Sequence, residues 1–159
     1  MRSFKYTDEW SRAAHLASTM LPMLPVFGDL DAIVPVPLHE SKFRKRGYNQ
    51  SALLAQSLAE SIGTPMMPLL VRTRETASQV DLSREDRMVN VAGAFALNPS
   101  WEPAAGSRFL ILDDVRTTSS TLNACANTLL RTGPKSIVVA TLALDIPKRE
   151  LQWWLDERG

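Results

Sequence analysis

F-L-I-L-D-D-V-R-T-T-S-S-T, residues 109–121, is the stretch of sequence that indicates the fold. Its first four residues are apolar without alternation, which is typical of a strand buried on both faces in a parallel sheet. Two carboxylates, Asp113 and Asp114, follow directly, and five hydroxyl residues come shortly after them. Apolar residues then recur at helical spacing from Leu122 to Leu130. The stretch therefore predicts a central strand, a polar loop and a helix.

This order of strand, polar loop and helix is typical of an anion site, because ligands of open α/β sheets bind beyond the carboxyl ends of the strands. The unpaired N–H groups of a helix N-terminus and neighbouring hydroxyls favour a phosphate. Carboxylates repel phosphate, so Asp113 and Asp114 are expected to accept hydrogen bonds from sugar hydroxyls or to hold a hydrated Mg²⁺ beside the phosphate. The alternative interpretation is a turn followed by a solvated helix cap.

The same segment resembles the signature of the type I phosphoribosyltransferases, which bind phosphoribosyl pyrophosphate (PRPP): an apolar strand, two acidic residues and a T-T-G-x-T-like loop. The resemblance implies an α/β fold with a mainly parallel sheet flanked by helices. It also implies that Asp113 and Asp114 contact the ribose hydroxyls, take part in catalysis and hold Mg²⁺. Hydroxyl residues would then bind the 5′-phosphate. These residues are Thr117, Thr118, Ser119, Ser120 and Thr121.

The loop departs from the family pattern at two positions. Ser119 lies where the family commonly has glycine, so a positive φ at this position would strain the backbone. Thr117 lies where purine-salvage members carry an aspartate base, and a hydroxyl is a poor general base near neutral pH. We therefore expect catalysis to depend on positioning and on neutralisation of the leaving group.

Length and composition favour one domain over residues 1–159, because a chain of 159 residues that is 45% hydrophobic can bury one good core. Eighteen Lys and Arg against 17 Asp and Glu give a net charge of +1, which indicates no global preference for polyanions. The single cysteine, Cys125, excludes an intrachain disulfide and is expected in the core. No apolar run is long enough to span a membrane and no signal peptide pattern is present, so a cytoplasmic location is expected.

The rest of the chain is expected to supply elements around the central strand. The expected helices are Thr7 to Leu21, ended by Pro22 and Pro25, and Asn49 to Ile62; the expected strands are Ala32 to Pro37, Met66 to Val71 and Ile137 to Leu142.

A basic loop is expected at residues 38–50, where four cations occupy the five positions from Lys42 to Arg46. A solvated basic loop is the alternative interpretation, since basic clusters alone are weak evidence of a site. In type I phosphoribosyltransferases the loop after the first core strand binds pyrophosphate. The resemblance therefore implies that Lys42, Arg44 and Arg46 bind the pyrophosphate of PRPP.

Residues 72–90 are polar and charged without core periodicity, which predicts a long loop with one helical turn near Arg84. In the family an equivalent loop closes over the reaction centre and excludes water. The resemblance implies that Arg84 and Arg87 contact pyrophosphate and take part in catalysis. An ordinary surface loop is the alternative.

Three further blocks, V-P-V-P-L-H, R-K-R-G-Y-N-Q and T-A-S-Q-V-D-L-S-R-E-D-R-M-V-N-V-A-G-A-F, follow one another as in the ComF family. The resemblance implies transfer of a phosphoribosyl group to an unidentified acceptor, with release of pyrophosphate. It equally implies a non-catalytic nucleotide- or phosphate-sensing module of the DNA-uptake (competence) machinery, with a protein partner or single-stranded DNA. The sequence also leaves open whether the chain forms a homo-oligomer. Fuller members begin with a four-cysteine zinc module, which a chain with one cysteine cannot form.

Overall fold

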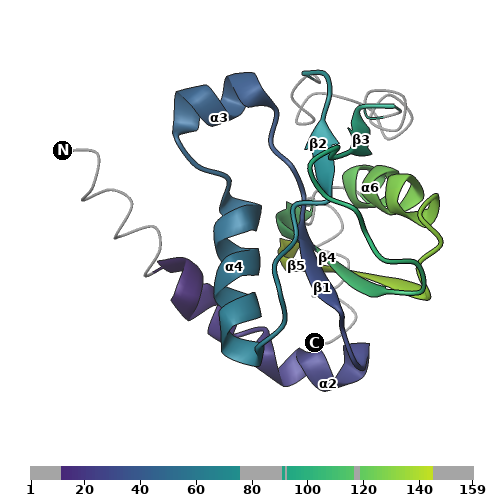
Figure 1. The fold of residues 1–159 in the computed structure, drawn as a ribbon. Helices are drawn as coiled ribbons and strands as arrows, with labels where there is room; N and C mark the ends of the chain where they lie inside the picture. Colours follow the sequence, from purple (N-terminus) through teal and green to yellow (C-terminus); the bar gives the residue numbers. More distant parts are fainter. Residues whose placement is uncertain (1–11, 76–90, 92, 117–118, 145–159) are drawn as a thin grey trace, which may run out of the picture.

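The computed structural model describes residues 12–75, 91, 93–116 and 119–144 (Figure 1). Its main feature is a three-stranded parallel sheet in the order β1-β4-β5. The strands are β1 (Ala32–Pro35), β4 (Arg108–Arg116) and β5 (Ser136–Leu144). The apolar run that begins at Phe109 therefore lies in the central strand, and the mainly parallel sheet expected from the sequence is confirmed.

Helices cover both faces of this sheet, α4 (Gln50–Ile62) on one side and α6 (Ser120–Leu130) on the other (Figure 1). Leu110 and Leu112 of β4 pack into the cluster that α4 completes, while Phe109 and Ile111 pack into the cluster that α6 completes. A strand buried on both faces has no reason to alternate, which explains the continuous apolar run. The expected core position of Cys125, on α6, is also confirmed.

The N-terminal part of the described chain breaks into short helices. Residues 12–18 are helical and are followed by η1 (Leu21–Met23) and α2 (Leu24–Phe27). The expectation of one helix to Leu21 was wrong: Pro22 and Pro25 lie in the first turns of η1 and α2. Proline is tolerated there because the N–H groups of a first turn have no partner within the helix.

Three elements lie beyond the carboxyl end of β1: α3 (Glu40–Arg46), β2 (Leu70–Arg72) and β3 (Phe95–Leu97) (Figure 1). The last two form a separate antiparallel pair. The expected basic loop is instead the helix α3, which begins after His39 and ends at Gly47 with φ 90°, a left-handed cap that suits glycine. Within the described part of the chain, no helix combines the length and the apolar character needed to cross a membrane.

The strand limits also differ from the expected ones. The first strand ends at Pro35 instead of Pro37. The strand expected from Met66 begins only at Leu70, and Met66 itself makes an isolated parallel bridge to Ile33. Pro68 lies between Met66 and Leu70 and lacks the N–H group that a continuous ladder of strand hydrogen bonds would need.

Candidate functional site

The acidic pair lies within β4, which corrects the expectation that the strand ends at Leu112. The strand continues because its two neighbouring strands end at different points. β1 stops at Pro35, opposite Leu112, whereas β5 continues to pair with β4 as far as Arg116. From Asp113 onward, β4 therefore has a described strand partner on one side only. On the side where β1 has ended, residues outside the sheet lie next to β4.

The first turn of α4 occupies this position beside Asp113. The Asn49 side chain donates from Nδ2 to the Val36 carbonyl oxygen at 2.9 Å, and its Oδ1 accepts from the Ser51 backbone N–H at 3.1 Å. Asn49 is thus the N-cap of α4, as its sequence position predicted. The Ser51 hydroxyl in turn donates to Asp113 Oδ1 at 2.7 Å. A chain of hydrogen bonds therefore runs from the end of β1 to the acidic pair.

The two oxygens of Asp113 have different surroundings. Oδ1 accepts both the Ser51 hydroxyl and, at 3.0 Å, the Asp114 backbone N–H. Among the described residues, no N–H or O–H group donates to Oδ2. The neighbouring Asp114 accepts the Val115 backbone N–H on its own Oδ1 at 2.8 Å. Within the described residues, the N–H and O–H donors to Asp113 thus converge on Oδ1, and the side chain of Asp114 also interacts with this carboxyl group.

Burial raises the pKa of Asp113 to about 6, because the charged form loses hydration. The hydrogen bond from Ser51 acts in the opposite direction, and the nearby charge of Asp114 raises the pKa further. Near neutral pH the carboxylate is ionised but poorly hydrated. Such a group gains more from a cation or a hydroxyl donor than a fully solvated carboxylate does.

A cation from another element lies in the electrostatic range of Asp113. Arg72, on β2, places its guanidinium 5.4 Å from the centre of the Phe95 ring on β3. Burial lowers the pKa of Arg72, while the charge of Asp113 raises it. The Cys125 thiol is itself neutral, because burial and the charge of Asp113 raise its pKa. No sequence pattern indicated a role for Arg72, because its approach to β4 depends on tertiary packing.

The basic residues expected to bind pyrophosphate lie on α3, which follows β1 at the carboxyl end of the sheet. Arg44 forms an ion pair with Glu40 that lowers the pKa of Glu40. Arg46 donates from Nη1 to the Gln50 Oε1 at 2.6 Å. Lys42 is half-buried. These contacts are local, so the charges of α3 stay at the surface.

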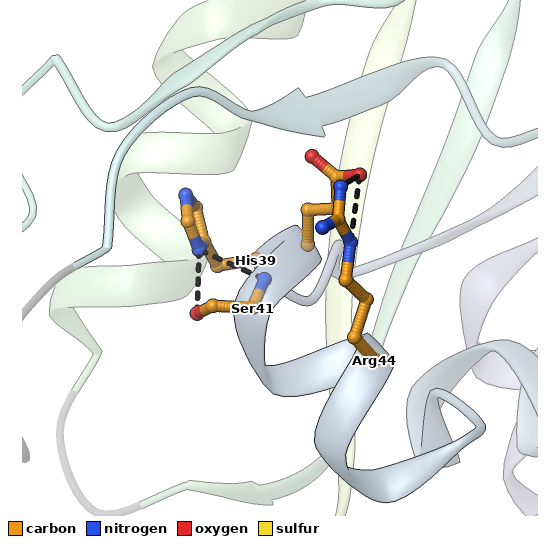
Figure 2. Close-up of polar contacts among 4 residues, drawn as sticks. His39, Ser41 and Arg44 are labelled. Atoms are coloured by element: carbon orange, nitrogen blue, oxygen red, sulfur yellow. Dashed lines mark hydrogen bonds and ion pairs between the residues drawn. The ribbon is translucent and has the colours of Figure 1, made fainter.

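Figure 2 shows how α3 begins. The His39 Nδ1 accepts the backbone N–H of Ser41 at 3.3 Å and lies 2.9 Å from the Ser41 hydroxyl. Histidine is an unusual N-cap, so neither the cap nor the helix that it starts was predicted from the sequence.

The described part of the hydroxyl loop joins α6 without strain. Ser119 has φ −74° and ψ −3°, and no described residue other than glycine has a positive φ. The positive φ that would have strained the backbone at Ser119 is therefore absent from this structure. Ser120 begins α6 and is buried, while Thr121 is half-buried. The other members expected at the site, Thr117 and Thr118 with Arg84 and Arg87, lie outside the described residues and stay predictions.

The acidic pair fits Mg²⁺ only together with a ligand. Among the described residues, no three or more His, Cys, Asp or Glu side chains are grouped so that they could hold a metal ion. Mg²⁺ is commonly held by one or two carboxylates together with water and substrate phosphates. Asp113 and Asp114 match that arrangement, so a Mg²⁺ bound here would arrive with a phosphate ligand.

The fold is that of the type I phosphoribosyltransferases. Adenine phosphoribosyltransferase from Saccharomyces cerevisiae superposes with a TM-score of 0.54 at 13% identity, over 86% of this chain and 68% of the other. A second adenine phosphoribosyltransferase gives a TM-score of 0.53 at 15% identity, over 89% of this chain and 73% of the other. At these identities the likeness concerns the fold alone.

The chain is homologous to Competence protein F, YhgH and ComFC, which confirms the resemblance to the ComF family. It is 40% identical over 114 residues to Competence protein F of Haemophilus influenzae, covering 71% of this chain and 50% of that protein. It is 40% identical over 110 residues to DNA utilization protein YhgH of Escherichia coli, covering 69% and 47%. Competence protein ComFC of Bacillus subtilis is 29% identical over 106 residues, covering 67% and 41%.

The chain thus spans about half the length of the relatives it matches. No protein-family model matches it.

Proposed function

We propose that this chain binds PRPP with Mg²⁺ at the carboxyl end of β4 and transfers the phosphoribosyl group to an acceptor, with release of pyrophosphate. The observation that supports the proposal is the acidic pair on the central strand, at the point where β1 has ended, followed by the N-terminus of α6. Ligands of open α/β sheets bind at this end, and helix N-termini favour phosphate.

In this proposal Asp113 and Asp114 accept hydrogen bonds from the ribose hydroxyls of PRPP. The hydroxyl residues from Thr117 to Thr121 would bind the 5′-phosphate at the start of α6, as in the type I phosphoribosyltransferases. When bound, Mg²⁺ would neutralise charge on the pyrophosphate. Oδ2 of Asp113 is the oxygen best placed to face the ligand, because Oδ1 is already held by two donors.

The transfer breaks the bond between C1 of the ribose and a pyrophosphate oxygen, and forms a bond between C1 and the acceptor. Pyrophosphate takes the electron pair, so cations near it stabilise the developing charge. The proposal assigns this role to Lys42, Arg44 and Arg46 of α3, with Arg84 and Arg87 as further predicted contributors. As its bond to C1 forms, the acceptor releases its proton to water, because the sequence indicates no strong base at Thr117.

Calorimetric titrations with PRPP, ribose 5-phosphate and pyrophosphate, each with Mg²⁺, test the binding part of the proposal. PRPP should bind most tightly, because it alone engages both the sugar-phosphate groups and the cations. Ribose 5-phosphate should bind more weakly at the same site and compete with PRPP. If neither PRPP nor ribose 5-phosphate binds, the proposed function is wrong.

Turnover needs a separate assay, because binding and transfer are distinct properties. Pyrophosphate release from PRPP would be followed across nucleobases, amines and water as acceptors. Release above the background of the Asp113→Asn, Asp114→Asn variant supports a transferase. Tight PRPP binding with no release for any acceptor would instead support a sensor that uses the same pocket.

A second candidate function is a non-catalytic module of the DNA-uptake machinery that engages single-stranded DNA or a protein partner. Its support is the surface of α3, where four cations occupy five positions and Phe43 between them is 48% exposed. Cations that follow a phosphate backbone and an aromatic side chain on which bases stack are the usual parts of a single-strand site. The three relatives described above are also named for competence or DNA utilization.

Anisotropy titrations of a labelled oligothymidylate at two salt concentrations test this second function. Removal of one cation that binds a phosphate should lower the salt slope by roughly 0.7, so Lys42→Ala with Lys45→Ala should flatten the dependence. Phe43→Ala should weaken binding without changing the slope, because stacking involves no counterion. An absence of binding at low salt would exclude direct contact with DNA through α3.

A further inference from the structure

We infer that Ser51 is a positioning residue that fixes the carboxylate of Asp113 and so presents its Oδ2 to the ligand. This inference rests on the proposed function and deepens it. Ser51 lies in the first turn of α4, 62 positions before Asp113, and no sequence motif joins the two residues. Their hydrogen bond is 2.7 Å long, and Ser51 is only 4% exposed.

The backbone of Ser51 is held in place by the cap of α4. Its backbone N–H donates to the Asn49 side chain, and Asn49 donates to the Val36 carbonyl oxygen at the end of β1. The donor therefore belongs to a turn that is tied to the sheet. A hydrogen bond to a carboxylate from such a fixed donor is stronger than one between neutral groups.

The position of this contact decides the orientation of the carboxylate. The terminal torsion of an aspartate is broad and roughly two-fold, so an unrestrained carboxylate samples many orientations. The Ser51 hydroxyl and the Asp114 backbone N–H both converge on Oδ1 of Asp113. Two donors on one oxygen fix the torsion and direct the second oxygen away from them. Because Asp113 is already ordered, ligand binding costs less conformational entropy.

Other polar and charged groups face Asp113 from the elements around it. They are Asp114 on β4, Arg72 on β2 and Cys125 on α6. The charge of Asp113 raises the pKa of both Arg72 and Cys125, and Asp114 also donates its backbone N–H to Asp113. Within the described residues, Ser51 is the side chain that donates a hydrogen bond to Asp113.

Ser57 offers a matched control on the same helix. It is 5% exposed, and its hydroxyl makes no hydrogen bond to any described residue. Ser57→Ala therefore removes a buried hydroxyl from α4 without touching the acidic pair. Ser51→Ala removes the proposed contact, and Ser51→Thr keeps a hydroxyl at the same place. Melting curves of all three variants report folding.

Two measurements test the inference. In calorimetry with PRPP and Mg²⁺, Ser51→Ala should bind about tenfold more weakly, as expected for loss of a hydrogen bond to a charged group, with Ser51→Thr and Ser57→Ala close to wild type. In the protein without ligand, the carboxyl ¹³C resonance of Asp113 at about pH 8 should move in Ser51→Ala and return in Ser51→Thr. If the Thr methyl group prevents folding, the Ser51→Ala and Ser57→Ala pair decides alone.

The two measurements also separate this inference from the proposed function. If wild type binds no PRPP, the proposed function fails, and the carboxyl resonance still reports whether Ser51 fixes Asp113. An unchanged resonance in folded Ser51→Ala overturns the inference. So does PRPP binding by Ser51→Ala that matches Ser57→Ala, or a folded Ser51→Thr that behaves like Ser51→Ala.

Discussion

The acidic end of β4 and the basic helix α3 lie at the same end of the sheet but are held in different ways. Asp113 is fixed by Ser51, which comes from another element 62 positions away. The charged side chains of α3 contact residues four positions away, as in the pairs Arg44 with Glu40 and Arg46 with Gln50. The acidic end is therefore organised by contacts between distant parts of the chain. The charged side chains of α3 are oriented only by local, solvent-exposed contacts, which are individually weak.

The largest expected difference between the two regions concerns ligand binding. Asp113→Asn with Asp114→Asn should weaken PRPP binding by roughly 100-fold or more, because two hydrogen bonds to charged groups are removed. Lys42→Ala with Arg46→Ala should weaken PRPP binding by only about tenfold and leave ribose 5-phosphate nearly unchanged, since that ligand has no pyrophosphate. Calorimetry on both double variants measures the contrast.

Both double variants should remain folded, because the changed side chains make few core contacts. Melting curves provide this control. Equal losses of PRPP binding in the two variants, or a larger loss in the α3 variant, would contradict the expectation that the acidic pair contributes more to PRPP binding than α3 does.

The half-buried position of Asp113 also predicts a dependence of stability on pH. Because its pKa in the folded protein, about 6, lies above the ordinary 3.8, the folded state favours the protonated form. This stabilisation is complete below the ordinary value and is lost as the pH rises through about 6. Between about pH 4 and pH 7, the free energy of unfolding of wild type should therefore fall by on the order of 1–3 kcal/mol relative to that of Asp113→Asn.

Urea unfolding of wild type and Asp113→Asn across this range measures the difference. The variant is isosteric and keeps an oxygen for Ser51, so packing contributes little to the comparison. A stability difference that stays constant with pH would show that Asp113 has an ordinary environment.

The caps of the two helices offer a smaller contrast. Asn49→Ala should cost about 1–2 kcal/mol of the free energy of unfolding, because it removes the cap of α4 and the contact with β1. His39→Ala should cost less than about 1 kcal/mol, since its cap on α3 is exposed and local. Chemical denaturation of both variants ranks them. A larger cost for His39→Ala would mean that α3 contributes more to the fold than its contacts suggest.

The smallest expected effect is that of Ser119→Gly. A strained Ser119 would bind phosphate better once replaced by glycine, but its φ of −74° is ordinary for any residue. We therefore expect unchanged or slightly weaker PRPP binding, because glycine adds freedom to the loop. Tighter binding by several-fold would show that the ligand-bound loop takes a positive φ at this position.

The sequence predicted those features that depend on local pattern. The continuous apolar run from Phe109 to Leu112 indicated a strand covered on both faces, and Asn49 with Gly63 marked the limits of α4. Polar residues in a strand were harder to predict. Asp113 and Asp114 extend β4 only because β5 offers them partners far along the chain.

The basic helix and the contact of Ser51 show two further reasons why sequence patterns fail. α3 has no buried residue, so it lacks the apolar periodicity from which helices are recognised. The contact between Ser51 and Asp113 joins residues that only the folded sheet brings together. The hydroxyl residues 117–121 and the acidic pair could be proposed as a site because they are neighbours in sequence, whereas Ser51 is distant in sequence and could not be.

Amide NMR mapping can locate the PRPP site on the folded protein. Titration of PRPP with Mg²⁺ into the labelled protein should shift amide resonances at Asp113 to Thr121 and in the first turn of α4, around Ser51. Resonances of residues 12–27, at the N-terminal end of β1, should stay in place (Figure 1). Shifts centred on residues 12–27, or none around Asp113 at saturation, would contradict a ligand site at the carboxyl end of β4.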